Sequence, residues 1–264
     1  MALDIVVCVK VVPKPEEVKL DAETKTLERR AAESIANPPD KNAMEFALKL
    51  KEKHKGKITL ISMGPPFFDD YLRLLMSMGA DHIVLLSDRA FAGADTYPTC
   101  LTLAEGIKKL GNVDIVICGE ESADGGTGQV PPGLAEALCF SQSTYAREIS
   151  YNEKEGRFII QRSVSGGYEV VSIPKPAVVS VELGVNSPRF PDFTMKKKLD
   201  GSYKVVIWTA KDLNLAEEKL GLKGSPTIVS ELIEVESPDR RRKILKGESK
   251  DVASKLADII IEHM

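Results

Sequence analysis

The segment from Val113 to Leu138 constrains the fold of this chain more than any other. It begins with VDIVIC, an apolar run without alternation, which is typical of a strand covered on both faces in a parallel sheet. A glycine-rich stretch, GEESADGGTGQVPPG, and a short apolar helix follow. Such a unit places backbone N–H groups and the positive end of a helix dipole at the carboxyl edge of the sheet, where an anion such as phosphate binds. We therefore expect a nucleotide-binding edge here.

The same strand–helix alternation runs through the first half of the chain. In the first expected helix, for example, Ala43, Phe46 and Leu50 share one face, and Asp40 is placed to cap it. This order predicts an α/β fold of three layers, a Rossmann-like open parallel sheet with helices on both faces. The expected strands are Ile5–Val12, Ile58–Met63, Ile83–Leu86 and Val113–Cys118, and the expected helices are Asp40–Lys53, Phe67–Met78, Thr96–Leu110 and Gln129–Leu138.

Two regions depart from this alternation. The polar stretch from Pro13 to Asn37 reads as a hairpin arm with a turn near Asp21–Thr24. After Phe140, strand candidates follow one another without helices between them, and we expect them to form an antiparallel extension of the main sheet. These candidates are Phe158–Val164, Val170–Ile173 and Ala177–Val181.

Regular alternation is lost from about Asn186. The last segment, Ser249–His263, is an amphipathic helix at the end of a thin tail, and such a tail often wraps around a partner subunit. The expected organisation is therefore a nucleotide-binding α/β domain at 1–185, a loop at 186–199 and a C-terminal extension at 200–264.

Composition narrows the possible functions. The chain is 43% hydrophobic and 28% charged with a formal net charge of −3, and it has no long basic run, which argues against a nucleic-acid partner. No apolar stretch approaches the roughly 20 residues needed to span a bilayer, and the start, MALDIVVCVK, lacks a signal-peptide pattern. Four separated cysteines and three histidines make a metal site improbable and suit a reducing cytoplasm.

Polar clusters follow each of the expected parallel strands. They are Val9–Pro13, Met63–Pro65, Gly93–Thr96 and Gly119–Gln129, and Asn37–Asp40 at the start of the first helix faces the same edge. Each cluster alone has a structural explanation, as a turn, a helix cap or, for Met63, a core position. Because ligands bind at the carboxyl ends of parallel strands, the convergence of these loops favours a nucleotide site.

Three carboxylates at this edge need a separate explanation. Asp40, Asp95 and Asp124 would repel a phosphate that they faced. We expect them to accept hydrogen bonds from ribose hydroxyls or adenine, or to hold loop backbone in place. Phosphate contact would then fall to the N–H groups of Gly125–Gly128 and to the Thr127 hydroxyl.

Stronger nucleotide fingerprints are missing from the sequence. No GxGxxG follows the first strand, and there is no GxxxxGK[ST]. Patterns of the HExxH or GxSxG type are also missing. The type of nucleotide is therefore not given by these motifs.

Motifs in several places along the chain point to one family. VCVKVVP at 7–13, NPPDKNAMEFALKLKE at 37–52, SMGPP at 62–66 and SMGADHIVLLSD at 77–88 precede the glycine-rich stretch, and IQRSVSGGYEVVSIPKPAVVS at 160–180 follows it. In this order they resemble the β subunit of electron transfer flavoproteins over nearly the whole chain. One departure is Ser165, where that family usually has an acidic residue.

The resemblance implies a heterodimer with an α subunit that carries an electron-transferring FAD, around which the C-terminal extension would wrap. The pocket of the β subunit would hold either AMP or a second FAD. With a second FAD the protein would be of the bifurcating class, in which NADH supplies two electrons. One electron goes to ferredoxin, and the other goes through the α-subunit FAD to a quinone reductase or an acyl-CoA dehydrogenase.

The resemblance and the polar clusters together give the expected cofactor-binding residues. They are Cys8, Val9, Lys10, Asn37, Pro38, Pro39, Asp40, Met63, Gly64, Asp95, Thr96, Cys118, Gly119, Ser122, Ala123, Asp124, Gly125, Gly126, Thr127, Gly128, Gln129 and Val130. No side chain is expected to act as a catalytic acid or base, because a bound flavin would carry the chemistry.

Two features of the sequence refine this expectation. SDRAFAGADT at 87–96, Asp40 and a short loop between Ala123 and Thr127 favour FAD over the alternative, structural AMP. NSPRFPDFTMKKK at 186–198 resembles the family's partner-recognition loop, with Phe193 as the expected anchor and Phe190 as the second candidate. A free-standing adenine-nucleotide sensor shares the sheet but not the Gly-Gly-x-Glu hairpin or the tail.

Overall fold

The structure is a computed structural model, and it describes residues 2–14, 33–229 and 244–262. The chain divides into two compact units, 1–231 and 232–264. The expected turn near Asp21–Thr24 lies outside the described residues. In the second unit, the expected amphipathic helix is present as α7 (Ser249–Glu262).

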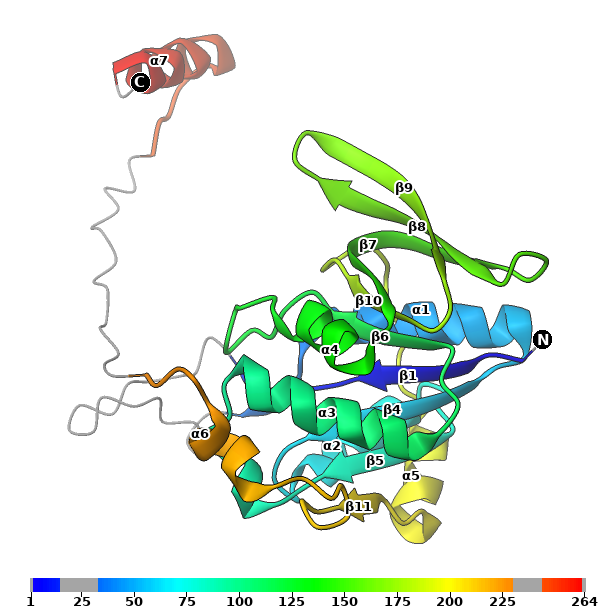
Figure 1. Cartoon of the computed structure of the whole chain (residues 1–264). Coiled ribbons are helices and arrows are strands. Elements are labelled where there is room, and N and C mark those ends of the chain that lie inside the picture. Colours follow the sequence, from blue (N-terminus) through cyan, green and yellow to red (C-terminus); the bar gives the residue numbers. More distant parts are fainter. Residues whose placement is uncertain (1, 15–32, 230–243, 263–264) are drawn as a thin grey trace. The chain divides into compact units, whose positions relative to one another are not determined.

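The first unit is built on one nine-stranded sheet (Figure 1). Its strand order is β11-β5-β4-β1-β6-β10-β7-β8-β9, and the pairs from β11 to β7 are all parallel. The bounds are β1 Asp4–Cys8, β4 Lys57–Met63, β5 His82–Leu86, β6 Ile115–Gly119, β7 Ser141–Asn152, β8 Arg157–Val164, β9 Gly167–Pro174, β10 Ala177–Val181 and β11 Val206–Trp208.

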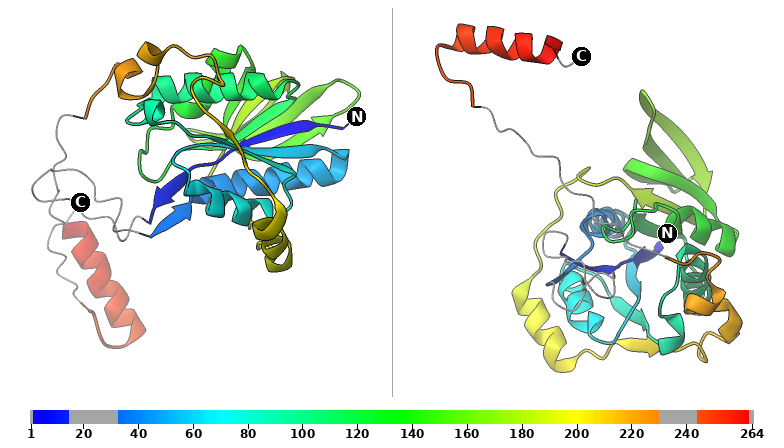
Figure 2. Two further views of the ribbon diagram at one scale, coloured as in Figure 1. Left: turned by 90° about the horizontal axis from the view of Figure 1, so that it is seen from below. Right: turned by 90° about the vertical axis from the view of Figure 1, so that its left-hand side faces the viewer.

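Helices cover both faces of this sheet (Figure 2). One apolar cluster unites the sheet with α1 and α2, and a second unites the opposite face with α3 and α4. The central strands are apolar on both sides because both faces are covered; β6, for example, is buried along its whole length. The helices are α1 Pro38–His54, α2 Phe68–Met76, α3 Thr96–Leu110, α4 Val130–Leu138, α5 Phe193–Ser202 and α6 Gly221–Gly224, with short 3-10 turns η2 at Arg89–Phe91 and η3 at Glu217–Lys219. The predicted fold class is therefore confirmed.

The first expected strand, Ile5–Val12, is wrong as a single element. The chain leaves the main sheet after Cys8, where the N–H of Val9 donates to the carbonyl of Ile61 at 2.9 Å. Val11–Pro13 then forms β2, which pairs antiparallel with β3 (Ser34–Ala36) in a separate two-stranded sheet. A continuous apolar run does not reveal this break, because all three residues of β2 are buried too.

The antiparallel extension is confirmed for β8 and β9, which contain two of the expected strands, and β8 pairs antiparallel with both β7 and β9. The expectation for Ala177–Val181 is wrong. This segment is β10, which lies inside the parallel part of the sheet between β6 and β7. All five of its residues are buried, as in the neighbouring strand β6. The neighbouring strand β7 was not predicted, because it is largely polar and only three of its twelve residues are buried.

The segment after Asn186 is more ordered than its sequence suggests. Asp192 caps α5 by accepting hydrogen bonds from the N–H groups of Thr194 and Met195 at 2.8 and 3.1 Å, so the expected loop at 186–199 contains the start of a helix. Further on, β11 adds a strand beside β5. Part of the expected extension therefore belongs to the main sheet.

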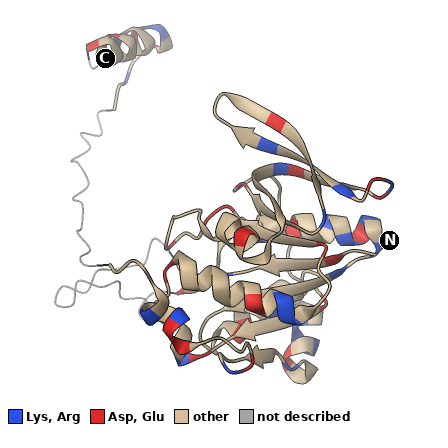
Figure 3. Cartoon of the chain, viewed as in Figure 1, with Lys and Arg blue, Asp and Glu red and all other residues tan. Residues whose placement is uncertain are grey.

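Charge and hydropathy of the described residues add two observations. Lysine, arginine, aspartate and glutamate are interspersed over the ribbon in the view of Figure 3. Among the described residues, no helix is both long and apolar enough to cross a membrane.

The core predicts a clear stability effect at Phe158. Its side chain is fully buried and packs at 4.9 Å between ring centroids against Tyr151. We expect Phe158→Ala to lower the free energy of unfolding of the full chain by about 3–5 kcal/mol, measured by urea denaturation. Phe190→Ala, at a side chain that is 92% exposed, serves as the control and should change it by less than about 0.5 kcal/mol. Equal effects of the two substitutions would contradict the proposed core.

Candidate functional site

The carboxyl ends of β1, β4, β5 and β6, with the loops that follow them, form one edge that we call the rim. From β1 the chain continues to β4 on one side, whereas from β6 it continues through α4 to β7 on the other side. The first helix after β1 and the helix after β6 also cover opposite faces of the sheet. Adjacent strands whose connections diverge in this way mark the position where open α/β sheets bind ligands.

Asn37 and Asp40 hold the loops of this position together. The two oxygens of Asp40 accept hydrogen bonds from the N–H of Lys10 at 2.7 Å and the N–H of Gly119 at 3.2 Å. The side-chain amide of Asn37 donates to Asp40 and to the carbonyl of Glu121, both at 2.9 Å, and its oxygen accepts from the N–H of Ala123 at 3.0 Å. Both side chains are buried, so this cluster, which we call the Asn37–Asp40 staple, fixes the loops after β1 and β6 to the start of α1.

The staple explains why position 119 is a glycine. A Cβ atom there would lie 2.4 Å from an oxygen of Asp40 and 2.7 Å from the Cβ of Pro39. Any larger residue would separate the end of β6 from α1. Pro38 and Pro39 form the first turn of α1, where the missing N–H groups cost no helical hydrogen bond.

The staple also changes the ionisation of Asp40. Burial raises the pKa of this carboxyl from its ordinary value of 3.8 to about 7, although the hydrogen bonds from Lys10, Asn37 and Gly119 oppose the rise. The neutral form is therefore favoured over a wider pH range in the folded chain than in the unfolded one. Asp40 thus holds loop backbone, one of the roles considered for it. The expectation that it caps the first helix is wrong, because Asn37 is the N-cap residue of α1 and the carboxylate accepts from the loops instead.

The loop after β6, Glu120–Gln129, which we call the glycine loop, is closed by a tight turn. The N–H groups of Gly125 and Gly126 both donate to the carbonyl of Ser122, at 3.1 and 2.8 Å. Within the described part of the chain no hydrogen bond uses the N–H groups of Thr127 and Gly128. These two, rather than all four groups of Gly125–Gly128, are therefore available to an anion.

A cation from the loop after the neighbouring strand β1 reaches into the glycine loop. The ammonium of Lys10 lies 2.5 Å from a carboxylate oxygen of Asp124 and 3.2 Å from the hydroxyl of Ser122. The Asp124 side chain is only 4% exposed, whereas that of Lys10 is 44% exposed. The negative charge of Asp124 is thus paired, and Lys10 keeps a solvent-facing part that can contact an anion.

Asp95 and Thr96 occupy a third part of the rim. Asp95 caps α3 through the N–H of Tyr97 at 2.9 Å, and its other oxygen accepts from the N–H and the hydroxyl of Thr227 at 3.0 and 2.7 Å. The N–H of Asp95 donates to the hydroxyl of Ser225 at 2.9 Å. Sequence reasoning missed Ser225 and Thr227, because no periodicity or motif marks them.

Thr96 connects this part of the rim to the glycine loop. Its hydroxyl lies 3.1 Å from the side-chain oxygen of Gln129, and Gln129 in turn lies 3.4 Å through its N–H from the hydroxyl of Thr127. Val130 begins α4, and its carbonyl accepts a weak hydrogen bond from Cys100 at 3.5 Å. The starts of α3 and α4 therefore lie side by side.

The remaining expected residues are packed into the fold. Cys8 and Cys118 lie in the apolar cluster beneath α3 and α4; a hydrogen bond with Cys8, followed by burial, raises the pKa of the Cys118 thiol well above its usual range. Val9 is buried in the apolar cluster that includes α1 and α2. Met63 packs against the cluster that includes α3 and α4. Position 64 is a glycine because a Cβ atom there would overlap the ring of Phe68.

Phe190 and Phe193 lie outside the rim. They are 92% and 75% exposed, yet the chain before and between them is anchored. Arg189 binds the buried carboxylate of Glu45 on α1 at 3.0 Å through both its N–H and its guanidinium, and the N–H of Asp192 donates to the carbonyl of Ser77 at 3.1 Å.

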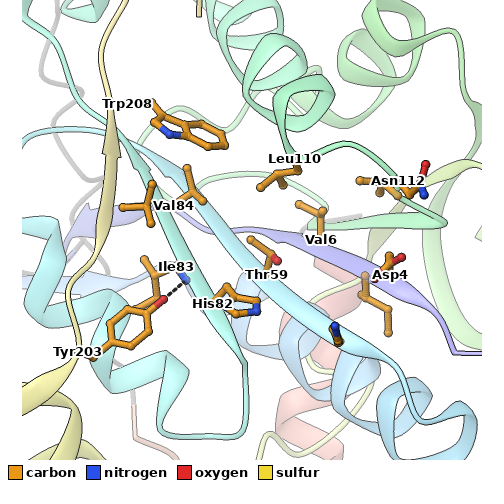
Figure 4. Close-up of a pocket in the computed structure, with 14 residues that line it drawn as sticks. Asp4, Val6, Thr59, His82, Ile83, Val84, Leu110, Asn112, Tyr203 and Trp208 are labelled. Carbon is orange, nitrogen blue, oxygen red and sulfur yellow. Dashed lines mark hydrogen bonds between the residues drawn. The ribbon is translucent and has the colours of Figure 1, made fainter. Parts of the chain in front are cut away.

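A hollow of about 300 Å³ lies at the opposite, amino edge of the sheet (Figure 4). His82 and Thr59 line it from β5 and β4, Tyr203 lines it from the segment before β11, and Trp208 lines it from β11 itself. The hydroxyl of Tyr203 accepts a hydrogen bond from the N–H of Ile83 at 2.8 Å, so it ties this segment to β5. The hollow shares no residue with the staple or the glycine loop.

The raised pKa of Asp40 predicts a pH-dependent stability. Because the folded chain binds this proton more tightly than the unfolded chain, stability falls as the pH rises from about 4 to about 7 and is then constant. Asp40→Asn removes the titration. We therefore expect the difference in unfolding free energy between wild type and Asp40→Asn to shrink by about 2–3 kcal/mol between pH 5 and pH 8, in urea denaturation. A difference independent of pH would contradict the assigned burial.

Comparison with known proteins agrees with this geometry. The electron transfer flavoprotein domain matches residues 24–213. The chain is 41% identical over 259 residues to an electron transfer flavoprotein subunit beta of Thermoanaerobacterium thermosaccharolyticum, covering 97% of both chains. It is 40% identical to the caffeyl-CoA reductase-Etf complex subunit CarD of Acetobacterium woodii, covering 85% of each. It is 39% identical to the protein FixA of Azorhizobium caulinodans, covering 86% of this chain and 83% of that one. The chain therefore belongs to the electron transfer flavoprotein family, among its β subunits.

Proposed function

We propose that this chain is the FAD-binding β subunit of a bifurcating electron transfer flavoprotein and forms a heterodimer with an α subunit. The observation that carries the proposal is the Asn37–Asp40 staple, which joins the loops after β1 and β6 beside a glycine loop with two available N–H groups. This arrangement suits the adenylate half of FAD.

Some residues of the rim would contact this cofactor, and others would hold the loops around it. The N–H groups of Thr127 and Gly128, with the ammonium of Lys10, would contact the diphosphate, since backbone donors and a partly exposed cation suit an anion. Asn37 and Asp40 would keep the loops in place without touching phosphate, which a carboxylate would repel. When bound, FAD would supply the ability to accept a hydride from NADH and to release electrons singly.

The proposed partners follow from the family. One electron would pass to ferredoxin, and the other would pass through the FAD of the α subunit to a quinone reductase or an acyl-CoA dehydrogenase type of acceptor. The name of CarD links that relative to caffeyl-CoA reductase, which supports a reductase acting on an acyl-CoA as one class of acceptor. The four cysteines, all free thiols, suit the reducing cytoplasm that we propose as its location.

The cofactor content of the heterodimer tests this function. The chain is co-expressed with its α subunit, and flavin and AMP are counted after denaturation. Two FAD molecules per heterodimer, both bleached by NADH, are expected. One FAD and one AMP per heterodimer would instead identify a non-bifurcating subunit in which AMP has a structural role.

The exposed phenylalanines predict a partner contact. Three lysines, at 196–198, follow Phe193, so the surface combines an apolar anchor with positive charge. We expect Phe193→Ala to slow electron delivery to the downstream acceptor at least several-fold, with unchanged bound nucleotide, because removal of a central aromatic anchor weakens an interface. Reduction of the acceptor is followed in stopped-flow experiments.

A substitution in the same helix provides the control for Phe193. Thr194→Ala removes a neighbouring exposed side chain, while the capping hydrogen bond from the N–H of Thr194 to Asp192 stays. It should leave the transfer rate unchanged. If Phe193→Ala behaves like this control, Phe193 is not the anchor, and Phe190→Ala becomes the next variant to measure.

A further inference from the structure

Tyr145, in β7, has a backbone conformation that a bulky residue seldom adopts. Its φ is 55°, in the left-handed region where a side chain with a Cβ is strained. Three other non-glycine residues of the described chain share this conformation, and two of them, Lys55 and Cys139, follow the ends of helices, where it is common. Tyr145 lies within a strand, so helix termination does not explain its conformation. Strained backbone of this kind is concentrated at functional sites.

A register shift and a hydrogen bond hold the strained residue in place. The register between β10 and β7 shifts at this point, since Val179 pairs with Ser143 and Val181 pairs with Ala146. The buried hydroxyl of Ser180 accepts a hydrogen bond from the N–H of Tyr145 at 3.0 Å. The pairing with β10 and the hydrogen bond to Ser180 therefore stabilise this bulge.

The bulge directs the side chain of Tyr145 to the glycine loop. A Cβ atom on Gly128 would lie 3.5 Å from the Tyr145 hydroxyl oxygen, so the hydroxyl lies against the end of the loop that precedes α4. The side chain is 44% exposed, and within the described residues its hydroxyl makes no hydrogen bond. A phenol that is exposed and without a hydrogen-bond partner can donate to a ligand.

The start of α4 offers an anion few backbone donors besides the N–H groups of Thr127 and Gly128. Its second and third residues are Pro131 and Pro132, which have no N–H, and the N–H groups of Gly125 and Gly126 are used by Ser122. A phosphate at this helix start therefore finds few backbone donors. The Tyr145 hydroxyl is a neighbouring side-chain group that can add one, beside the ammonium of Lys10.

We propose that Tyr145 is a ligand-binding residue whose hydroxyl donates a hydrogen bond to the phosphate held by the glycine loop. This role rests on the proposed function and adds a residue from β7 to a site otherwise built from the rim. The strained backbone of Tyr145 would be retained because it places that hydroxyl beside Gly128.

Binding measurements on the nucleotide-free heterodimer test this role, with AMP, FAD and adenosine as probes in calorimetric titrations. Tyr145→Phe keeps the ring and the backbone but removes the donor. We expect it to weaken AMP and FAD binding about 10-fold or more, as for a hydrogen bond to a charged group, and to leave adenosine binding unchanged. Adenosine separates the phosphate contact from a general effect on the pocket.

Glycine substitutions separate strain from binding. Tyr145→Gly and the matched control Lys55→Gly both relieve a φ of 55°, so both should raise or maintain the thermal midpoint. Only Tyr145→Gly should lose affinity for AMP. A lowered midpoint for Tyr145→Gly alone would mean that its ring stabilises the fold, and unchanged AMP affinity in that variant would count against the proposal.

The outcomes distinguish this proposal from the proposed function. If wild type binds AMP or FAD and Tyr145→Phe binds both equally well, the role of Tyr145 is wrong while the nucleotide site stands. An equal loss of adenosine and AMP binding in Tyr145→Phe would also overturn it. If wild type binds neither AMP nor FAD, both proposals fail.

Discussion

The structure depends on a buried carboxylate and a buried amide that bring three chain segments to one point. Asp40 and Asn37 accept or donate the hydrogen bonds that the loops after β1 and β6 would otherwise leave unmade. Burying a polar group costs free energy unless the group is hydrogen-bonded. Here the two side chains and the loop backbone groups form hydrogen bonds with one another. The same contacts require glycine at position 119 and raise the pKa of Asp40. Local packing, loop geometry and ionisation are thus consequences of one cluster.

The rim residues divide into supports and available donors. The staple, the cap at Asp95 and the paired Asp124 account for all three carboxylates without a ligand. In the proposed function, phosphate contact falls to backbone N–H groups, Lys10 and Tyr145. Such a division is expected there, since the bound FAD would carry the redox chemistry and the protein would supply position and electrostatics.

Much of this could be predicted from the sequence, for physical reasons. Apolar runs such as Ile115–Cys118 identify central strands because both faces are covered, and helical periodicity identifies α1 and α3. The break after Cys8 and the pairing of β10 depend on long-range contacts that a local pattern does not contain. Tyr145 was missed because a bulge is set by the neighbouring strand, and Thr227 was missed because it is 132 residues from the Asp95 that it binds.

One helix serves two surfaces. Asp40 in the first turn of α1 secures the loops around the proposed cofactor, while Glu45 and Glu52 further along it bind Arg189, directly before the exposed Phe190. Within a rigid helix these positions are separated by about 18 Å at most, from the rise of 1.5 Å per residue. Substitutions in α1 are therefore constrained twice, and a shift or rotation of this helix would disturb the proposed cofactor site and the proposed partner contact together.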